Sequence, residues 1–414
     1  MNFLLLSIRC YPVNLIDIFY LIITAFALYF SLLFLIIFWE NKQKIKEVPK
    51  IDKLPTVTLI VPAHNEEKKI VNTITCLKNL NYPKKLLEII VVDDGSTDRT
   101  AEVAKKTGVK VIRKEKGGKA NALNYALKYA KGEIVGVVDA DSYPEPNALM
   151  KSLPFFSDPM VASVTTRILA KDSKGLLGKL QEIEYALIAW TRKLLEYVDS
   201  IQATPGPLSL YRRKILNELG GFDENNATED IEIAWRLMDA GYKIRMAGAE
   251  TKTEIPKSIR GWWKQRIRWN IGGFQTSYKY RKSAFRKGSG TFGFFVVPFS
   301  VISYVLSILL LSVIFYFVIY HVVMYGTYLI SALSIGLNPL KYLSLPVLDT
   351  FFVFVIPIAI MTVAILVLGL SGIKNMRSGR SWLEFAVFLG VYIALYPFVL
   401  IDSLIKYARG YREW

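Results

Sequence analysis

Two aspartates stand one residue apart, directly after a run of residues that is typical of a buried strand. Asp139 and Asp141 follow residues 133–138, and a separation of two points both carboxylates the same way from the strand end. Carboxylate oxygens, completed by diphosphate oxygens, suit Mg²⁺ or Mn²⁺. A simple turn at Asp-Ser-Tyr-Pro explains the same residues, so this pair alone is weak evidence for a metal site.

A second carboxylate pair and a glycine turn have the chemistry to bind a nucleotide. Asp93 and Asp94 follow the strand-like residues 87–92 and can accept hydrogen bonds from a base N–H or a ribose hydroxyl. Turn formation and helix capping explain them equally well. Lys119 begins a predicted helix after a Gly-Gly turn, where backbone N–H groups and the ammonium suit a diphosphate. The spacing is not that of a P-loop.

Two further groups of residues have the chemistry for a transfer reaction. Glu229 and Asp230 stand at the start of a predicted helix, where capping is the simpler explanation and general-base action by Asp230 is the functional one. Gln265, Arg268 and Trp269 are spaced i, i+3 and i+4, so they share one helical face. Arginine pairs with phosphate oxygens, and tryptophan offers a sugar ring an apolar surface. An ordinary interfacial helix explains these three residues too.

The intervening segments predict the elements that bring these residues together. Strand-like runs alternate with helical spacing, as in a mostly parallel α/β sheet with crossover helices. The predicted strands are 56–61, 87–92, 109–112 and 133–138, and the predicted helices are 66–80, 98–107 (capped by Ser96 and Thr97) and 119–131. Ligands of such sheets bind at the carboxyl ends of the strands, so Pro62 and Asn65 should join the aspartates at one crevice.

Taken together and in this order, the motifs resemble glycosyltransferase family 2, in the membrane-embedded branch that includes cellulose, chitin, hyaluronan and poly-N-acetylglucosamine synthases. The resemblance covers residues 56–275. It rests on Val-Pro-Ala-His-Asn-Glu (61–66), Val-Val-Asp-Asp-Gly-Ser-Thr-Asp (91–98), Gly-Lys-Ala-Asn (118–121), Val-Asp-Ala-Asp (138–141), Thr-Glu-Asp (228–230) and Gln-Arg-Ile-Arg-Trp (265–269). It implies a GT-A fold, which is a Rossmann-like and mostly parallel α/β domain, combined with transmembrane helices.

The same resemblance implies a reaction with a UDP-sugar and Mg²⁺ or Mn²⁺. Asp141 would bind the metal with Asp139 beside it, and Asp230, paired with Glu229, would be the catalytic base. The acceptor oxygen would attack from the side opposite UDP and invert the sugar. The other matched residues would contact substrates: Pro62, Asn65, Glu66, Asp93, Asp94 (uridine), Lys119 (diphosphate), Gln265, Arg268 and Trp269 (acceptor and diphosphate).

The chain departs from the family pattern in two places. Residues 204–208 read Thr-Pro-Gly-Pro-Leu ahead of an Arg-Arg pair, where members often carry a Ser-Gly or Phe-Gly turn, and this leaves the shape of the acceptor site open. One span precedes the catalytic segment instead of two or four, and few follow it. Glycosyl transfer is therefore better supported than export of a polymer.

Composition excludes several classes of protein. Of 414 residues, 52% are hydrophobic and 21% are charged, which fits neither a disordered chain nor a pure membrane bundle. Lys and Arg number 52 against 35 Asp and Glu, a net charge of +17. Two cysteines exclude a disulfide scaffold, and with two histidines they argue against a Cys/His zinc site. Any metal should be a hard ion held by carboxylates.

Apolar residues gather at the two ends, which predicts a multi-pass membrane protein. Residues 18–39 hold no charge and would reach about 33 Å as a helix, so we expect a retained anchor. The stretch 291–335 is too long for one span, and we expect an interfacial piece at 292–298 before a span at 300–323. Two spans with a turn near residue 325 are the alternative. Further spans are expected at 351–373 and 382–401.

Basic residues beside the spans predict the orientation and the domains. Residues 256–290 contain ten Lys or Arg and no Asp or Glu, so the middle domain should lie on the cytoplasmic side of a cell membrane. Interleaved aromatic residues favour helices in the headgroup layer over nucleic-acid binding. The predicted domains are an anchor (15–39), a GT-A domain (50–255), interfacial amphipathic helices (256–298) and about three spans (299–414).

Three functions stay open at this stage. One is a synthase that extends a β-linked polysaccharide, and another is a non-processive transferase that places one sugar on a lipid or polyprenyl phosphate. The third is a non-catalytic transporter or scaffold, against which the carboxylate clusters argue. The expected partners are a nucleotide sugar, a carbohydrate or lipid-linked acceptor and the bilayer, without nucleic acid. The sequence identifies no partner subunit.

Overall fold

The computed structural model describes residues 15–336 and 382–410 of the chain. These residues fall into two compact units, which we call the helical unit (15–36 and 309–336) and the α/β unit (37–308 and 382–410). The α/β unit holds the sheet and every residue that the motifs single out, and the helical unit consists of apolar helix. Each unit is described by itself.

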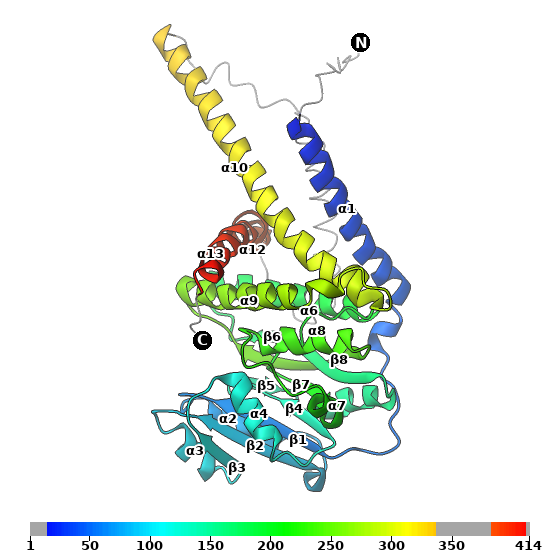
Figure 1. Ribbon diagram of the computed structural model, residues 1–414. Coiled ribbons are helices and arrows are strands. Elements are labelled where there is room, and N and C mark those ends of the chain that lie inside the picture. Colours follow the sequence, from blue (N-terminus) through cyan, green and yellow to red (C-terminus); the bar gives the residue numbers. More distant parts are fainter. Residues whose placement is uncertain (1–14, 337–381, 411–414) are drawn as a thin grey trace. The chain divides into compact units, whose positions relative to one another are not determined.

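An eight-stranded sheet organises the α/β unit (Figure 1). Its order is β3-β2-β1-β4-β7-β6-β8-β5. The strands are β1 (Val57–Ala63), β2 (Leu87–Asp94), β3 (Lys110–Lys114), β4 (Ile134–Val137), β5 (Ser142–Pro144), β6 (Val161–Lys171), β7 (Ser209–Arg212) and β8 (Lys243–Glu254). The first four strands are mutually parallel, β7 enters antiparallel to β4 and β6, and β6 and β8 are parallel again. The predicted mostly parallel sheet is confirmed.

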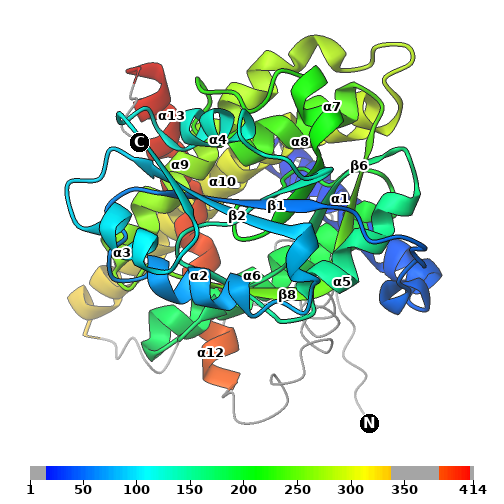
Figure 2. The ribbon, with the colours of Figure 1, turned by 90° about the horizontal axis from the view of Figure 1, so that it is seen from below.

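Helices cover both faces of the sheet because its strands are apolar on both faces. Within β1, Leu59 and Val61 pack into one core cluster with α2 (Ile70–Lys78) and α5 (Ala148–Ser152). Ile60 turns to the opposite cluster, with α4 (Lys119–Leu127) and α8 (Glu229–Asp239). Figure 2 shows α2 and α4 on opposite sides of β1 and β2.

The start of the helix after β2 differs from the prediction. This helix, α3, spans Thr100–Lys106, and neither Ser96 nor Thr97 caps it. The hydroxyl of Ser96 instead accepts the Asn65 N–H, and Asp98 accepts the Thr100 N–H at 2.9 Å. The polar residues after β2 therefore tie two strand-end loops together, a task that helix-capping rules do not reveal.

Two long helices complete the α/β unit on the side of the motif residues. They are α6 (Gly175–Glu196) and α9 (Ile259–Lys279). Helix α9 packs against α8 and against α13 (Tyr396–Ala408), which follows α12 (Trp382–Val387) through one π-helical and one 3₁₀ turn. A short helix, α7 (Arg213–Glu218), follows β7. Trp262 and Phe274 of α9 are buried in protein, so these two aromatic residues do not face a headgroup layer as expected.

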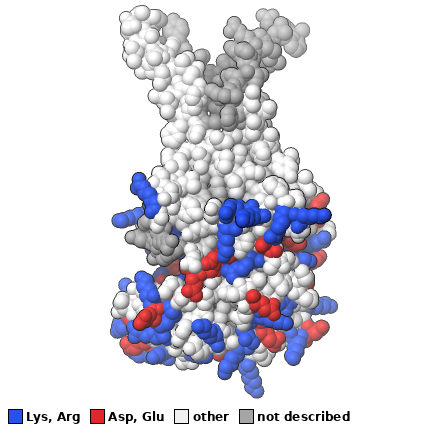
Figure 3. Space-filling view, in the orientation of Figure 1, with Lys and Arg blue, Asp and Glu red and all other residues white. Residues whose placement is uncertain are grey.

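Three described helical segments are long and apolar enough to cross a membrane: Leu21–Asn41 in α1 (Leu15–Asn41), Phe292–Leu309, and Leu383–Ala408. On the face drawn in Figure 3, charged side chains gather on the α/β unit. Within 291–335, a π-helical turn (Phe292–Val296) continues directly into α10 (Val297–Ser334), so no break separates the predicted interfacial piece from the predicted span. That wide turn accommodates Pro298, which lacks an N–H, without ending the helix. The predicted span 351–373 lies outside the described residues.

Candidate active site

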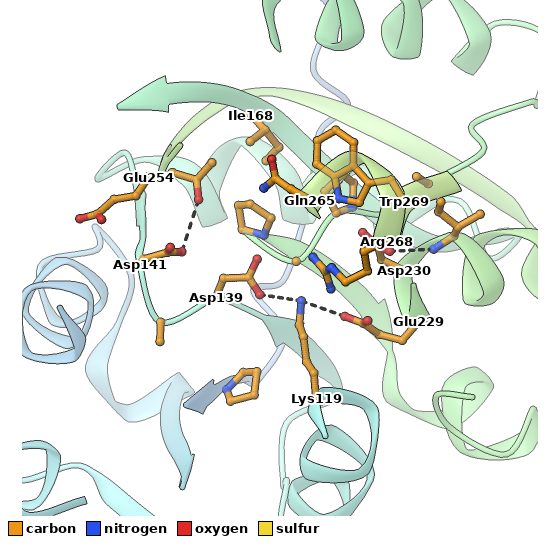
Figure 4. Close-up of a pocket in the computed structure, with 18 of the residues that line it drawn as sticks. Lys119, Asp139, Asp141, Ile168, Glu229, Asp230, Glu254, Gln265, Arg268 and Trp269 are labelled. Atoms are coloured by element: carbon orange, nitrogen blue, oxygen red, sulfur yellow. Dashed lines mark hydrogen bonds and ion pairs between the residues drawn. The ribbon is translucent and has the colours of Figure 1, made fainter. Parts of the chain in front are cut away.

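A cavity of about 670 Å³ opens at the carboxyl ends of β1, β2 and β4, as the sequence predicts. Residues from α4, α6, α8 and α9 complete its wall (Figure 4). Eleven of the predicted site residues line it: Pro62, Glu66, Asp94, Lys119, Asp139, Asp141, Glu229, Asp230, Gln265, Arg268 and Trp269.

Lys119 joins two of the predicted carboxylates. Its Nζ lies 2.7 Å from Asp139 Oδ1 and 2.8 Å from Glu229 Oε1 (Figure 4). Burial alone would lower the pKa of Lys119, but Asp139, Glu229 and Asp230 outweigh it and raise this pKa. Burial opposes ionisation of Glu229, yet Lys119 holds the pKa of Glu229 below its usual value. Both partners are thus charged, and they fix the start of α4 to the end of β4.

Asp230 differs from its neighbour Glu229 because no cation pairs with it among the described residues. One oxygen, Oδ1, accepts the N–H of Ile231 at 3.0 Å. Burial and the adjacent Glu229 raise the pKa of Asp230 to about 6. A carboxylate that is ionised near neutral pH, unpaired and exposed to a cavity has the properties of a general base.

Asp141 lies near a hydroxyl group and a lysine that is shared with two other carboxylates. Its Oδ1 is 3.5 Å from the Thr253 hydroxyl, and its Oδ2 is 3.7 Å from Lys69 Nζ, which also contacts Glu66 and Glu254. Burial and Asp139 raise the pKa of Asp141 to about 6. Added positive charge would relieve this, so Asp139 and Asp141 fit a hard divalent ion that keeps diphosphate and water ligands. Among the described residues, no three His, Cys, Asp or Glu side chains are grouped to hold a metal alone.

The carboxylate pair after β2 is divided between two tasks. Asp94 lines the cavity, and its oxygens accept Lys114 Nζ at 2.7 Å and the N–H groups of Gly117 and Gly118 at 2.9 and 2.8 Å. Asp93 is fully buried and pairs with Arg113 at 3.1 Å. It lies outside the cavity wall.

Asn65 also lies outside the cavity wall. Its φ of 56° is in the left-handed region, and its Oδ1 accepts the Thr97 N–H at 2.9 Å. Asn65 and Asp93 therefore shape the loops and are not in contact with the cavity, contrary to the predicted substrate-binding role.

Helix α9 sends two sets of side chains to different neighbours. Gln265, Arg268 and Trp269 line the cavity, so their predicted common face is confirmed. Arg266 is instead buried and donates to both carboxylate oxygens of Glu184 on α6. We call this the Arg266–Glu184 pair.

Two tyrosines join the Arg266–Glu184 pair to the C-terminal helical segment. The hydroxyls of Tyr392 and Tyr396 donate to Glu184, and Trp262 Nε1 donates to Tyr392 Oη at 2.6 Å. The pair thus fixes the motif helix to α6 and to residues 382–408.

The Pro-Gly-Pro segment at 205–207 forms part of the cavity wall. Gly206 O accepts the Asp139 N–H at 3.0 Å, and Thr204 N donates to the Asp230 carbonyl at 3.1 Å. A Cβ on Gly206 would lie 2.4 Å from Lys119 Nζ and 2.5 Å from Asp139 Oδ1. Any side chain here would have to displace the ion pair, and the segment that departs from the family pattern contacts both Asp139 and the candidate base.

The sequence reasoning missed most of the wall that α6 supplies. Tyr185, Ile188 and Arg192 line the cavity from one face of this helix, since their spacing is i, i+3 and i+7. Ile168 and Glu254, at the ends of β6 and β8, were also missed. Helix α6 is amphipathic, but no sequence motif indicates that its polar members reach the site.

Comparisons with known proteins agree with this geometry. Residues 58–220 match the family model described as glycosyl transferase family 2. A poly-beta-1,6-N-acetyl-D-glucosamine synthase of Staphylococcus aureus (strain COL) is 32% identical over 246 residues, covering 57% of this chain and 59% of that protein. The Bacillus subtilis (strain 168) protein named "Probable glycosyltransferase YdaM" is 34% identical over 262 residues, covering 60% of this chain and 62% of that protein. The match thus spans about three fifths of each relative.

A solved structure matches nearly the whole chain. It is a mannosyltransferase from Pyrobaculum calidifontis in complex with GDP-Man and Mn²⁺, with a TM-score of 0.61 and 22% identity, covering 96% of this chain and all of that one. This likeness shows a shared fold, a GT-A-like sheet with long apolar helices. The match to glycosyl transferase family 2 covers residues 58–220, the segment that runs from β1 to β7 of the sheet.

Proposed function

We propose that the chain is an inverting, metal-dependent hexosyltransferase that moves a sugar from a UDP-sugar to a growing β-linked polysaccharide at the membrane. The observation that carries the proposal is the single cavity that holds Asp139, Asp141, Lys119 and Asp230. A nucleotide diphosphate needs the first three, and an acceptor hydroxyl needs the fourth. The polysaccharide product is inferred from the printed name of the Staphylococcus aureus relative.

The residues divide the reaction between donor and acceptor. Lys119 and Arg268 would bind the diphosphate, and Asp94 would contact the uridine from its loop. Mg²⁺ or Mn²⁺, held by Asp141 with Asp139 beside it, would neutralise the charge of the leaving diphosphate. Asp230 would take the proton of the acceptor hydroxyl as its oxygen bonds to C1 of the sugar and the bond from C1 to the phosphate oxygen breaks. One displacement without a protein nucleophile inverts C1.

Trp269 and Gln265 would position the acceptor sugar. Both line the cavity from the face of α9 that also carries Arg268. The indole offers an apolar surface for the ring, and the amide offers hydrogen bonds to its hydroxyls. We also propose the sequence-based topology, with the α/β unit on the cytoplasmic side of the cell membrane. The apolar helices and the ten basic residues of 256–290 support it.

The test is UDP release by the full chain in lipid nanodiscs, measured with a panel of UDP-sugars and Mn²⁺ or Mg²⁺. One UDP-sugar should support turnover, which Asp230→Asn and Asp141→Asn should each abolish. Unchanged turnover in both variants would refute the assignment. Radiolabelled sugar should then appear in high-mass material.

A second candidate is the transfer of one sugar to a lipid or polyprenyl phosphate. The apolar part of the cavity wall favours it, since Ile168, Ile188 and Ile231 line the same cavity as Asp230. A purely carbohydrate acceptor has no need of such a wall. Product size separates the two candidates, because single transfer yields labelled material that is soluble in organic solvent and of low mass.

A further inference from the structure

Arg192, on α6, is a cavity residue that the proposed mechanism does not use. It lines the same wall as Tyr185 and Ile188, at positions i+7 and i+4 from them. Its Nη1 is buried, and no described residue offers it a hydrogen-bond partner. This one nitrogen of the guanidinium has lost water contacts without replacing them, which costs stability unless a ligand supplies the missing acceptor.

The cavity residues Lys119 and Arg268 already have roles in the proposed mechanism. Lys119 is held by Asp139 and Glu229 at the donor side. Arg268 faces Glu229 and Asp230 from α9, in the motif proposed to contact the diphosphate. Arg192 lines the cavity from α6. Asp230 is the acidic group that acts most strongly on it, but no ion pair within 4.0 Å joins them.

Arg192 keeps its charge at neutral pH. Burial lowers the pKa of its guanidinium to about 10, and Asp230 opposes this shift. The wall that holds this positive charge also contains the apolar residues Ile188, Ile231 and Pro207, while Asp230 and Tyr185 act on the guanidinium electrostatically. A cation beside apolar side chains fits a ligand that combines an anionic group with an apolar chain. A planar guanidinium is especially suited to the paired oxygens of a phosphate.

We propose that Arg192 binds a phosphate group of the sugar acceptor, so that this enzyme selects acceptors in which a phosphate joins the accepting sugar to a lipid. The inference rests on the proposed function and adds the chemical class of its acceptor. A phosphorylated lipid-linked sugar is either the sole acceptor or the primer of a polymer. Arg192 is then a specificity-determining residue that contacts the acceptor and does not contact the UDP-sugar.

The test compares three acceptors with the full chain in nanodiscs: a polyprenyl-phosphate-linked sugar, the same sugar 1-phosphate in solution, and a neutral alkyl glycoside of that sugar. With Arg192→Gln, the KM for the lipid-linked phosphate should rise about ten- to a hundredfold, as expected for a lost charged hydrogen bond. The KM for the UDP-sugar should not change. Arg192→Lys should restore part of the affinity, and Lys174→Gln, at an exposed lysine before α6, should have no effect.

Two results would overturn the proposal. One is an unchanged KM for both phosphates in Arg192→Gln, and the other is an equal loss with the neutral glycoside. An equal rise in KM for the soluble sugar phosphate and for the lipid-linked one would show that Arg192 binds the phosphate. It would also reject the proposed preference for a lipid-linked acceptor. A fall in melting temperature beyond that of Arg192→Lys would show a structural role instead. If no acceptor supports Asp230-dependent UDP release, the proposed function itself fails, and this outcome is distinct from all the others.

Discussion

The proposed donor and acceptor sides of the cavity differ in whether their charged side chains form ion pairs. On the donor side, Lys119 is paired with Asp139 and Glu229, and Asp94 is paired with Lys114. On the proposed acceptor side, Asp230 and Arg192 have no ion pair among the described residues, and Arg192 Nη1 is buried without a hydrogen-bond partner. Internal pairs make the donor side rigid before substrate arrives. The unpaired charges of the acceptor side are the ones left for reacting groups, a proton and phosphate oxygens.

The largest expected effect tests the unpaired carboxylate. Asp230→Asn keeps the side-chain shape but removes the base, so turnover should fall about 10²- to 10⁴-fold. Binding of UDP, measured by calorimetry, should change little, because the donor side remains intact. Asp239→Asn, at the other end of α8, breaks a surface ion pair with Arg286 and serves as the matched control. A loss in both variants would point to damage of the helix rather than loss of a base.

The donor side was the part that the sequence predicted well. Each of its residues directly follows a strand-like run, and parallel strands bring their carboxyl ends to one edge whatever the rest of the fold does. Local patterns therefore sufficed for Asp94, Asp139 and Asp141. The exceptions are Asn65 and Asp93, whose side chains serve neighbouring loops, because residue type alone does not tell a ligand from a turn residue.

The acceptor side depended on packing that no local pattern contains. Arg192 reaches the cavity only because α6 crosses the sheet edge beside α9, and the two helices are joined by the Arg266–Glu184 pair, 82 residues apart in the chain. The role of Gly272 also depends on a residue that is distant in the sequence, so no local pattern predicts it. A Cβ there would lie 1.8 Å from Thr228 Oγ1, so glycine lets α9 pass against the start of α8.

Removing one member of the Arg266–Glu184 pair tests how the acceptor side is held. Glu184→Ala leaves Arg266 buried without its anion, which should lower the free energy of unfolding by about 3–5 kcal/mol. The double variant Glu184→Leu/Arg266→Met removes both charges and should recover part of that loss. The rest remains because the hydroxyls of Tyr392 and Tyr396 lose their acceptor. Thermal unfolding in detergent measures both. Equal destabilisation in the single and double variants would mean that packing, and not charge, joins α6 to α9.

A smaller effect is expected at the boundary between the two sides. Gly206→Ala places a methyl group against the Lys119–Asp139 ion pair, and the strain of such overpacking is about 1–3 kcal/mol. If the displaced ion pair bears the strain, kcat/KM should fall about ten- to a hundredfold. Gly248→Ala is the control, because a Cβ there meets nothing within 4 Å. Full activity of Gly206→Ala would show that the donor-side ion pair tolerates displacement and is less rigid than we infer.

The smallest effect is a dependence of the rate on pH that arises from Asp230. Burial and Glu229 raise the pKa of Asp230 to about 6, and a base acts only when deprotonated. The rate should therefore be constant above about pH 7 and fall about tenfold for each unit below pH 6. UDP binding measured without a divalent metal should not follow this curve if Lys119 dominates it, because the neighbouring carboxylates raise the pKa of Lys119 and keep it charged. The metal is left out because burial and Asp139 also raise the pKa of Asp141, the proposed metal ligand, to about 6. The measurement is kcat at saturating donor and acceptor from pH 5 to 8, beside the Kd for UDP at each pH. Parallel titration of both quantities would place the ionising group on the donor side and remove the distinction between the two sides.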